Sequence, residues 1–255
     1  MLIEIDGMKL NYKATGEGKD VVLLHGWGGQ INSFEFVHKQ LEKKFRTYSL
    51  DLPGFGKSDS PPEPWGIEDY SKIFNKFINS IKIHNPILIG HSFGGRIAIH
   101  YAADNNVEKL ILVDSAGIKS KRNLAYYYKV YTYKLVKYVL RLPGFSLYSE
   151  AILQQVKKKL GSSDYRSASG VMQGTLVKIV NQDLRAFLPR IKAPTLLIWG
   201  DNDQVTPLSD AELIKSLIPN SGLVVLKNAG HYSYIDNARD FLIVLNKFLE
   251  DRKGS

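Results

Sequence analysis

The stretch PILIGHSFGGRIAIH, residues 86–100, decides the fold of this chain. Its first part, Pro86 to Ile89, is a short apolar run with the length and β-branched content of a buried strand. After Gly95 the apolar residues follow helical spacing instead. Between the two lies Gly90-His91-Ser92-Phe93-Gly94, the pattern G-x-S-x-G, which places a serine on a sharp strand-to-helix turn. The sequence therefore predicts a strand, a strained turn at Ser92 and a helix.

The predicted turn lifts the Ser92 hydroxyl clear of its neighbours at the N-terminus of the helix. There the Phe93 amide and the positive end of the helix dipole would face negative charge that develops on a bound oxygen. Glycine-rich strand-to-helix turns also occur in α/β proteins in which the serine only caps the helix. The pentapeptide alone leaves both a nucleophilic and a capping role open.

Strand and helix patterns alternate along most of the chain. Strands are predicted at residues 2–5, 9–14, 21–24, 46–50, 86–89, 110–113, 194–199 and 222–226, and helices at 34–43, at 67–83, after Gly95 and at 237–250. Such alternation is typical of a mostly parallel sheet covered by helices on both faces. We expect an α/β fold with a central sheet of about eight strands.

The alternation stops after Gly117. The segment that follows is rich in Tyr and Lys and helical in pattern, without a clear strand. We expect residues 1–118 and 185–253 to form the core, and residues 119–184 to form an inserted all-helical cap.

Composition narrows the class of protein. The 255 residues include no cysteine, which excludes disulfides and thiolate metal sites. The N-terminus lacks the charged and apolar regions of a secretion signal, and no later run approaches the about 20 apolar residues of a membrane span. These features predict a cytoplasmic protein.

The net charge of +9 comes from one segment. Lys119 to Leu160 holds ten Lys or Arg and one acid, and the rest of the chain holds 24 of each sign. This predicted cap surface is interpreted as a solvated basic face, with attraction to anionic membranes or anionic substrates as the alternative. Nucleic-acid binding is not expected, because no recognition motif accompanies the charge.

Three polar groups follow predicted strands: Ser92, an acid near 203, and His231. The carboxyl ends of parallel strands meet at one edge of a sheet, where such folds bind ligands. A serine hydroxyl needs an imidazole to accept its proton, and the imidazole needs a carboxylate to fix its tautomer. The chain order Ser, Asp, His is the order given for α/β-hydrolases.

Other loops carry the same signature. The motifs are HGWGG at 25–29, DLPGFGKSD at 51–59, GHSFGG at 90–95, WGDNDQVTP at 199–207 and GH at 230–231. In this order and spacing they resemble the α/β-hydrolase superfamily over essentially the whole chain, and the predicted cap falls where that family usually carries one.

The resemblance implies a role for each matching residue. Ser92 and His231 would be catalytic, and Asp203 matches the family's acid, with Asp114 and then Asp201 as alternatives. The amides of Trp27 and Phe93 would form the oxyanion hole. No metal or organic cofactor is implied. From the residues themselves we expect His25 and Asp51 to organise loops.

The expected activity is hydrolysis of carboxylic esters with small to medium apolar acyl groups, a small-molecule substrate. One alternative is C–C bond hydrolysis of diketones, as in the meta-cleavage product hydrolases that the chain also resembles. Those enzymes commonly carry G-N-S-x-G-G, whereas this chain has His91. Another alternative is a ligand-binding receptor with slow hydrolysis. Serine at the elbow argues against dehalogenase or epoxide hydrolase chemistry.

Overall fold

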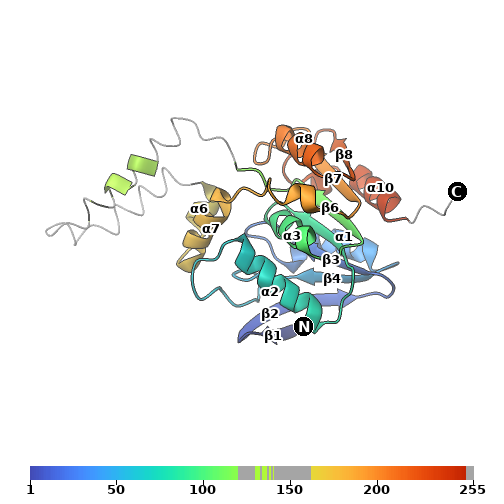
Figure 1. The fold of residues 1–255 in the computed structure, drawn as a ribbon, viewed down its shortest axis with the longest axis horizontal. Coiled ribbons are helices and arrows are strands. Elements are labelled where there is room, and N and C mark those ends of the chain that lie inside the picture. Colours follow the sequence, from blue (N-terminus) through green and yellow to red (C-terminus); the bar gives the residue numbers. More distant parts are fainter. Residues whose placement is uncertain (120–129, 133, 137, 139, 141–161, 251–255) are drawn as a thin grey trace.

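The computed structural model describes residues 1–119, 130–132, 134–136, 138, 140 and 162–250. They build one sheet of eight strands in the order β1-β2-β4-β3-β5-β6-β7-β8 (Figure 1). The strands are β1 (Leu2–Ile5), β2 (Met8–Thr15), β3 (Asp20–Leu24), β4 (Arg46–Leu50), β5 (Ile87–His91), β6 (Lys109–Val113), β7 (Thr195–Gly200) and β8 (Ser221–Leu226). β2 runs antiparallel to both β1 and β4, and the other neighbours are parallel. The prediction of a mostly parallel sheet of about eight strands is confirmed.

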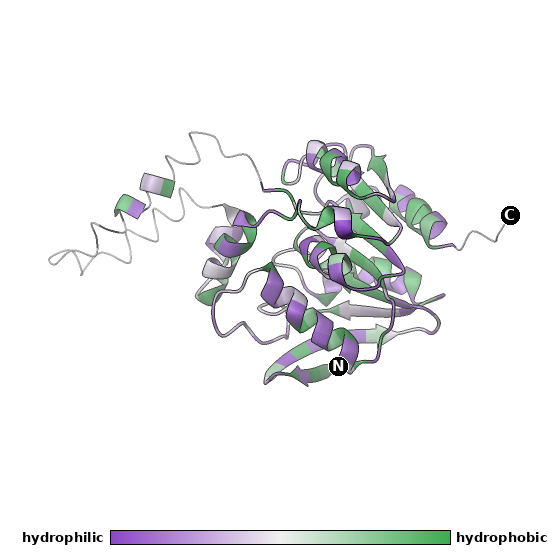
Figure 2. Ribbon diagram, viewed as in Figure 1, coloured by the Kyte–Doolittle hydropathy of each residue, from purple (hydrophilic) through white to green (hydrophobic). Residues whose placement is uncertain are grey.

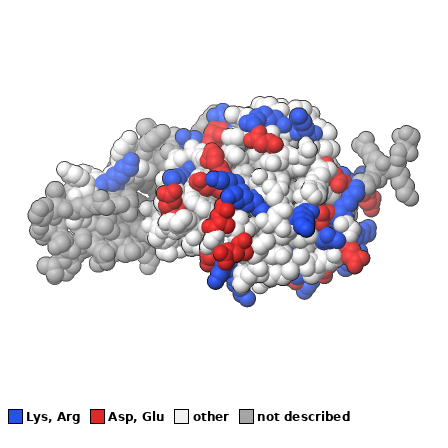
Figure 3. Space-filling model, turned by 60° about the horizontal axis from the view of Figure 1, so that its bottom comes forward, with Lys and Arg blue, Asp and Glu red and all other residues white. Residues whose placement is uncertain are grey.

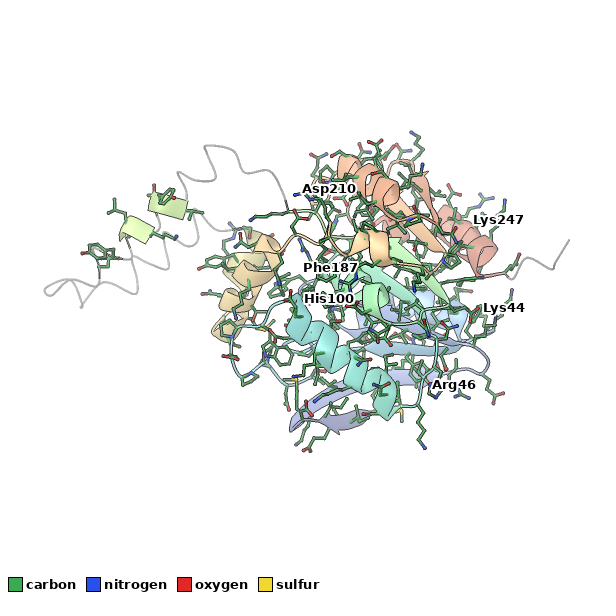
Figure 4. All side chains as sticks on the ribbon, in the orientation of Figure 1. Lys44, Arg46, His100, Phe187, Asp210 and Lys247 are labelled. Carbon is green, nitrogen blue, oxygen red and sulfur yellow. The ribbon has the colours of Figure 1, made fainter. Side chains whose placement is uncertain are left out.

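Helices cover both faces of the sheet (Figure 1). One face is covered by α2 (Ile67–Ser80), α3 (Phe93–Asp104) and α8 (Leu208–Leu217), and the other by α1 (Glu35–Leu41), α9 (Ser233–Asp236) and α10 (Ala238–Leu249). A short 3-10 turn, η1 (Ile31–Phe34), directly precedes α1, and another, η2 (Leu188–Arg190), precedes β7. His100 of α3 lies against Phe187 at the start of η2, with ring centroids 4.6 Å apart (Figure 4).

The central strands carry mostly hydrophobic residues, which are green in Figure 2. In β3, Val21 and Leu23 point to the core beneath α1 and α10, whereas Val22 and Leu24 point to the core beneath α2 and α3. Strand side chains alternate between faces, so a strand buried on both sides reads as a continuous apolar run. This is why the short runs around residues 22, 88 and 111 were recognisable as strands.

The structure corrects the predicted end of α2. The sequence predicts a helix to Ile83, but α2 ends at Ser80. Lys82 adopts a left-handed φ of +57°, and the Ile83 amide donates to Ile78 O at 3.0 Å, which closes the helix. Glycine is usual at such a position, so a lysine there gave no stop signal. Ile81, directly after the last residue of α2, is only half-buried.

The described part of the predicted cap includes α6 (Ser163–Ser167) and α7 (Val171–Asn181). Residues 130–132, 134–136 and 138 are also helical. α7 is fastened to the loop before α2, since the Trp65 amide donates to Thr175 Oγ1 at 3.0 Å and the Ile67 amide donates to Gln182 Oε1 at 2.7 Å. Most of the basic stretch predicted at residues 119–160 lies outside the described residues, so the boundaries of core and cap stay a prediction.

Acidic and basic side chains are interspersed over the described core in the view of Figure 3. Within the described part of the chain, no helix combines the length and apolar character needed to cross a membrane.

Candidate active site

The turn at Ser92 is strained, as predicted from the sequence. Ser92 lies between β5 and α3 with φ 49° and ψ −108°, a combination that a residue with a side chain rarely adopts. Its side chain makes no capping hydrogen bond to α3, so it does not act as a helix cap. A Cβ on Gly90 would lie 2.7 Å from the backbone of Gly94 and Gly95. Glycine at this position therefore lets β5 and α3 approach closely around the serine.

The site lies where the order of the strands in the sheet reverses. After β3 the chain turns to β4 on one side, and after β5 it proceeds to β6 on the other. In open α/β sheets, ligands bind in the crevice that such a reversal leaves at the carboxyl ends of the strands. The loop with Trp27 follows β3 and Ser92 follows β5, so this crevice separates the two predicted oxyanion donors.

The structure brings Ser92, Asp203 and His231 together. Nε2 of His231 lies 3.0 Å from Ser92 Oγ, and its Nδ1 lies 2.8 Å from Asp203 Oδ2. A carboxylate only accepts, so Nδ1 carries the ring proton and Nε2 is left as an acceptor for the Ser92 hydroxyl. The His231 side chain is 13% exposed, which leaves the ring accessible at one edge.

Asp203 is held as a charged carboxylate. Its Oδ1 accepts the amides of Val205 at 2.8 Å and Thr206 at 3.0 Å, and its Oδ2 accepts the Thr206 hydroxyl at 2.7 Å. Burial alone would raise the pKa of this carboxyl, but the hydrogen bonds from His231 and Thr206 outweigh burial and the pKa lies below its usual value.

Asp114, the first alternative acid, is engaged elsewhere. Its Oδ1 accepts the Gly200 amide at 2.9 Å, and its Oδ2 accepts the amide of Ser233 at 3.0 Å and the Ser233 hydroxyl at 2.6 Å. Burial raises the pKa of Asp114 to about 7. Asp114 therefore ties the end of β6 to the end of β7 and to α9.

Asp201, the second alternative, accepts the Ala229 amide at 3.3 Å and lies 3.9 Å from Lys227 Nζ. It therefore links the loop that follows β7 to the loop that follows β8. Of the three acids, Asp203 is the one hydrogen-bonded to the imidazole of His231.

The amide of Trp27 lies in the loop that follows β3, and the amide of Phe93 lies at the first residue of α3. Neither amide has a hydrogen-bond acceptor within the described part of the chain. Their side chains meet beside the serine, with ring centroids 5.4 Å apart, and Phe55 packs 4.9 Å from Trp27. The two free donors are therefore bordered by an apolar, aromatic wall.

His25 and Asp51 organise loops, as expected. His25 Nδ1 donates to Gly26 O at 2.7 Å, and its Nε2 accepts the Leu52 amide at 3.0 Å. Burial lowers the pKa of His25 to about 4, which keeps the ring neutral. Asp51 accepts the amides of Ile31 and Lys57 at 2.6 and 2.9 Å.

The sequence predicted no role in the site for two residues that the structure places there. Thr206 donates to the acid, and His91 contacts the main chain of His231, with its Nε2 2.8 Å from His231 O. Thr206 lies inside the motif quoted at 199–207. Its position three residues after Asp203 was the one sequence signal that could have indicated a hydrogen bond to the acid. Nothing near His91 in the sequence indicates a partner 140 residues away. In the described residues, no group of three His, Asp or Glu side chains is placed to hold a metal ion.

Comparisons with known proteins agree with this fold. The family model of the alpha/beta hydrolase fold matches residues 20–238. The AB hydrolase superfamily protein YisY of Bacillus subtilis is 27% identical over 247 residues, covering 91% of this chain and 92% of its own length. A pimeloyl-[acyl-carrier protein] methyl ester esterase of Pseudoalteromonas atlantica is 27% identical over 258 residues, covering 92% and 96%.

Among solved structures, an esterase from Exiguobacterium antarcticum superposes with a TM-score of 0.74 at 27% identity, and 97% of each chain is covered. A family model that spans most of the chain, together with relatives aligned nearly end to end, identifies the family. The chain belongs to the alpha/beta hydrolase family and is a hydrolase of that fold.

Proposed function

We propose that this protein is a serine hydrolase that cleaves carboxylic esters of small to medium apolar acyl groups through an acyl-enzyme on Ser92. The observation that carries the proposal is the continuous chain of contacts from Ser92 Oγ through His231 to Asp203, at 3.0 and 2.8 Å. A hydroxyl, an imidazole and a carboxylate in this arrangement generate a nucleophile at neutral pH.

In the proposed mechanism, Ser92 Oγ attacks the ester carbonyl while His231 Nε2 takes its proton. The amides of Trp27 and Phe93 donate to the oxygen as it becomes negative. His231 then protonates the leaving alcohol, which departs as the acyl-enzyme forms. A water molecule, deprotonated by His231, attacks the acyl group, and Ser92 regains its proton when the acid leaves.

Asp203 stabilises the imidazolium formed in each half-reaction. Because its four hydrogen bonds keep it ionised, it fixes the Nδ1–H tautomer before the reaction and balances the positive charge during it. Preorganised donors and charges of this kind are usually the largest single contribution to catalysis.

The preference for an apolar acyl group is supported by the aromatic wall. Trp27 and Phe55 are half-buried, Phe93 is buried, and all three rings pack against one another beside Ser92. The relative from Pseudoalteromonas atlantica and the neighbour from Exiguobacterium antarcticum are both named esterases.

The test is hydrolysis of p-nitrophenyl esters from acetate to decanoate by the parent protein and by Ser92→Ala. Repeated turnover that peaks at one chain length and vanishes in Ser92→Ala is the expected result. A fluorophosphonate probe, which reacts with activated serines, provides a control that needs no substrate: it should label the parent and not the variant.

Two outcomes would favour an alternative to ester hydrolysis. If the probe labels Ser92 but no ester is hydrolysed, a diketone with a C–C bond to cleave becomes the next substrate class to assay. If each protein molecule processes about one ester and then stops, the receptor alternative gains over the enzyme.

A further inference from the structure

His231 is held at two points by consecutive residues of the elbow. Its imidazole Nε2 lies 3.0 Å from Ser92 Oγ, and its main-chain carbonyl lies 2.8 Å from His91 Nε2. Ser92 and His91 sit at the end of β5, whereas His231 lies in the loop between β8 and α9. The contact from His91 therefore joins the main chain of the proposed base to the strand that carries the nucleophile.

The His91 ring cannot move away from this contact. It is 2% exposed and is surrounded by other rings, with centroid distances of 5.0 Å to His231, 5.1 Å to Tyr232 and 5.2 Å to Tyr234. On its remaining side, a Cβ at Gly26 would lie 2.6 Å from His91 Nδ1. The His91 ring therefore packs against the Gly26 backbone, and a residue with a side chain at position 26 would collide with the ring.

The protonation of His91 follows from its partner. A carbonyl oxygen only accepts, so Nε2 of His91 must carry a proton. Burial lowers the pKa of His91 to about 3, with the neighbouring His231 acting in the same direction. The titratable groups that act on the His91 ring are His231, Asp203 and His25. His91 is therefore a neutral ring with one fixed donor, and it adds no second cation beside the imidazolium of His231.

We propose that His91 is a positioning residue for the base: its Nε2–H holds the His231 carbonyl and so sets the position of the imidazole relative to Ser92 Oγ. The inference rests on the proposed function, because it concerns the same proton transfer. Displacement of a catalytic group by about 1 Å can cost about 100-fold in rate, so a single donor at this place is consequential.

The competing explanation is that His91 only fills space among the aromatic rings. Three substitutions separate the two roles. His91→Gln keeps an N–H donor at the distance of Nε2 from the backbone, and His91→Met has nearly the same length and shape without a donor. His91→Phe keeps a flat ring and also lacks the donor. His38→Gln is the matched control, since His38 is fully buried and hydrogen-bonded to Ser49 at 2.7 Å, outside the proposed site.

The first measurement is the imidazole ¹⁵N and Nδ1 proton NMR spectrum of His231, which needs no substrate. The parent, His91→Gln and His38→Gln should show one fixed tautomer with a sharp Nδ1 proton. In His91→Met and His91→Phe the proton signal should broaden or vanish, because the imidazole samples several positions. A fixed His231 signal in all variants would overturn the inference even if ester hydrolysis were absent.

The second measurement is the kinetics on the best p-nitrophenyl ester. His91→Met and His91→Phe should lose about 10- to 100-fold in kcat with KM nearly unchanged, and His91→Gln should recover most of the loss. Equal losses in His91→Gln and His91→Met would show that the ring matters and not the donor, which would also overturn the inference. An inactive parent with a perturbed His231 signal in His91→Met would overturn the proposed function alone.

Discussion

The hydroxyl of Thr206 lies 2.7 Å from Oδ2 of Asp203, the carboxylate oxygen that also accepts from His231. A hydrogen bond to an ionised group is shorter and stronger than one between neutral groups. Thr206 is buried, so water does not replace its hydroxyl if it is removed. The acid of the proposed triad is therefore supported by a buried side chain.

Thr206→Val should lower kcat about tenfold and leave KM unchanged, because a hydrogen bond to a charged group contributes about 1.5–3 kcal/mol and part is recovered by the remaining amides. Valine keeps the shape of the side chain. Thr206→Ser, which restores the hydroxyl, should recover the activity. Parental kinetics in Thr206→Val would mean that the backbone amides alone hold Asp203.

The two buried acids should respond differently to the same change. Asp203→Asn should reduce kcat about 10³- to 10⁴-fold, because the amide favours the wrong imidazole tautomer. Asp114→Asn should reduce kcat less than about tenfold while lowering the free energy of unfolding by about 1–3 kcal/mol, since its new amide group faces the Ser233 amide. Ester kinetics and urea unfolding of both variants test this assignment of the acid. A large loss of kcat in Asp114→Asn with a small loss in Asp203→Asn would make Asp114 the acid.

Stability should depend on pH through Asp114. Burial raises the pKa of Asp114 to about 7, against about 4 in an unfolded chain. The folded protein therefore binds more protons than the unfolded chain between these values, and the contribution of Asp114 to stability, complete below pH about 4, is lost as the pH rises to about 7. Asparagine does not titrate, so the unfolding free energy of the parent minus that of Asp114→Asn should fall across this range and level off above it. A difference that grows with pH would contradict the assignment.

The start of α3 should tolerate no side chain at Gly95. A Cβ there would overlap Oγ of the buried Ser115, and Gly95→Ala should cost about 1–3 kcal/mol of stability. The double variant Gly95→Ala with Ser115→Gly removes the overlap and should recover much of the loss. Gly222→Ala in β8 is the control, because a Cβ there meets no atom within 4 Å and stability should change by less than about 1 kcal/mol. Additive effects in the double variant would show that Ser115 is not the obstacle.

Much of the fold could be predicted from the sequence because local signals agree with it. The eight strands were recognisable as apolar runs, and the turn at Ser92 follows from the glycines around it. α8 and α9 were not predicted. α9 spans only Ser233–Asp236, too short for a periodic pattern, and one Ser233 contact that fixes it comes from Asp114, 119 residues away.

The residues of the candidate site could also be predicted in large part from the sequence. The residues placed in one hydrogen-bonded chain, Ser92, Asp203 and His231, all follow strands whose ends meet at one edge of the sheet. The choice among three acids could not be made from spacing, because it depends on which carboxylate the neighbouring amides occupy. Asp114 is occupied by Gly200 and Ser233, whereas Oδ2 of Asp203 is directed to the imidazole. The contact of His91 with the His231 carbonyl could not be predicted for the same reason, since that partner is known only once β8 lies beside β7.

The order of the strands has a consequence for the time at which the site forms. Ser92 follows β5 and Asp203 follows β7, but His231 comes only after β8, which lies at the edge of the sheet and leaves the ribosome after the other seven strands of that sheet. Domains acquire structure as units once their elements are available. During synthesis the chain would thus carry an elbow serine without a base, and the nascent protein would stay inactive until β8 has docked and brought His231 to Ser92.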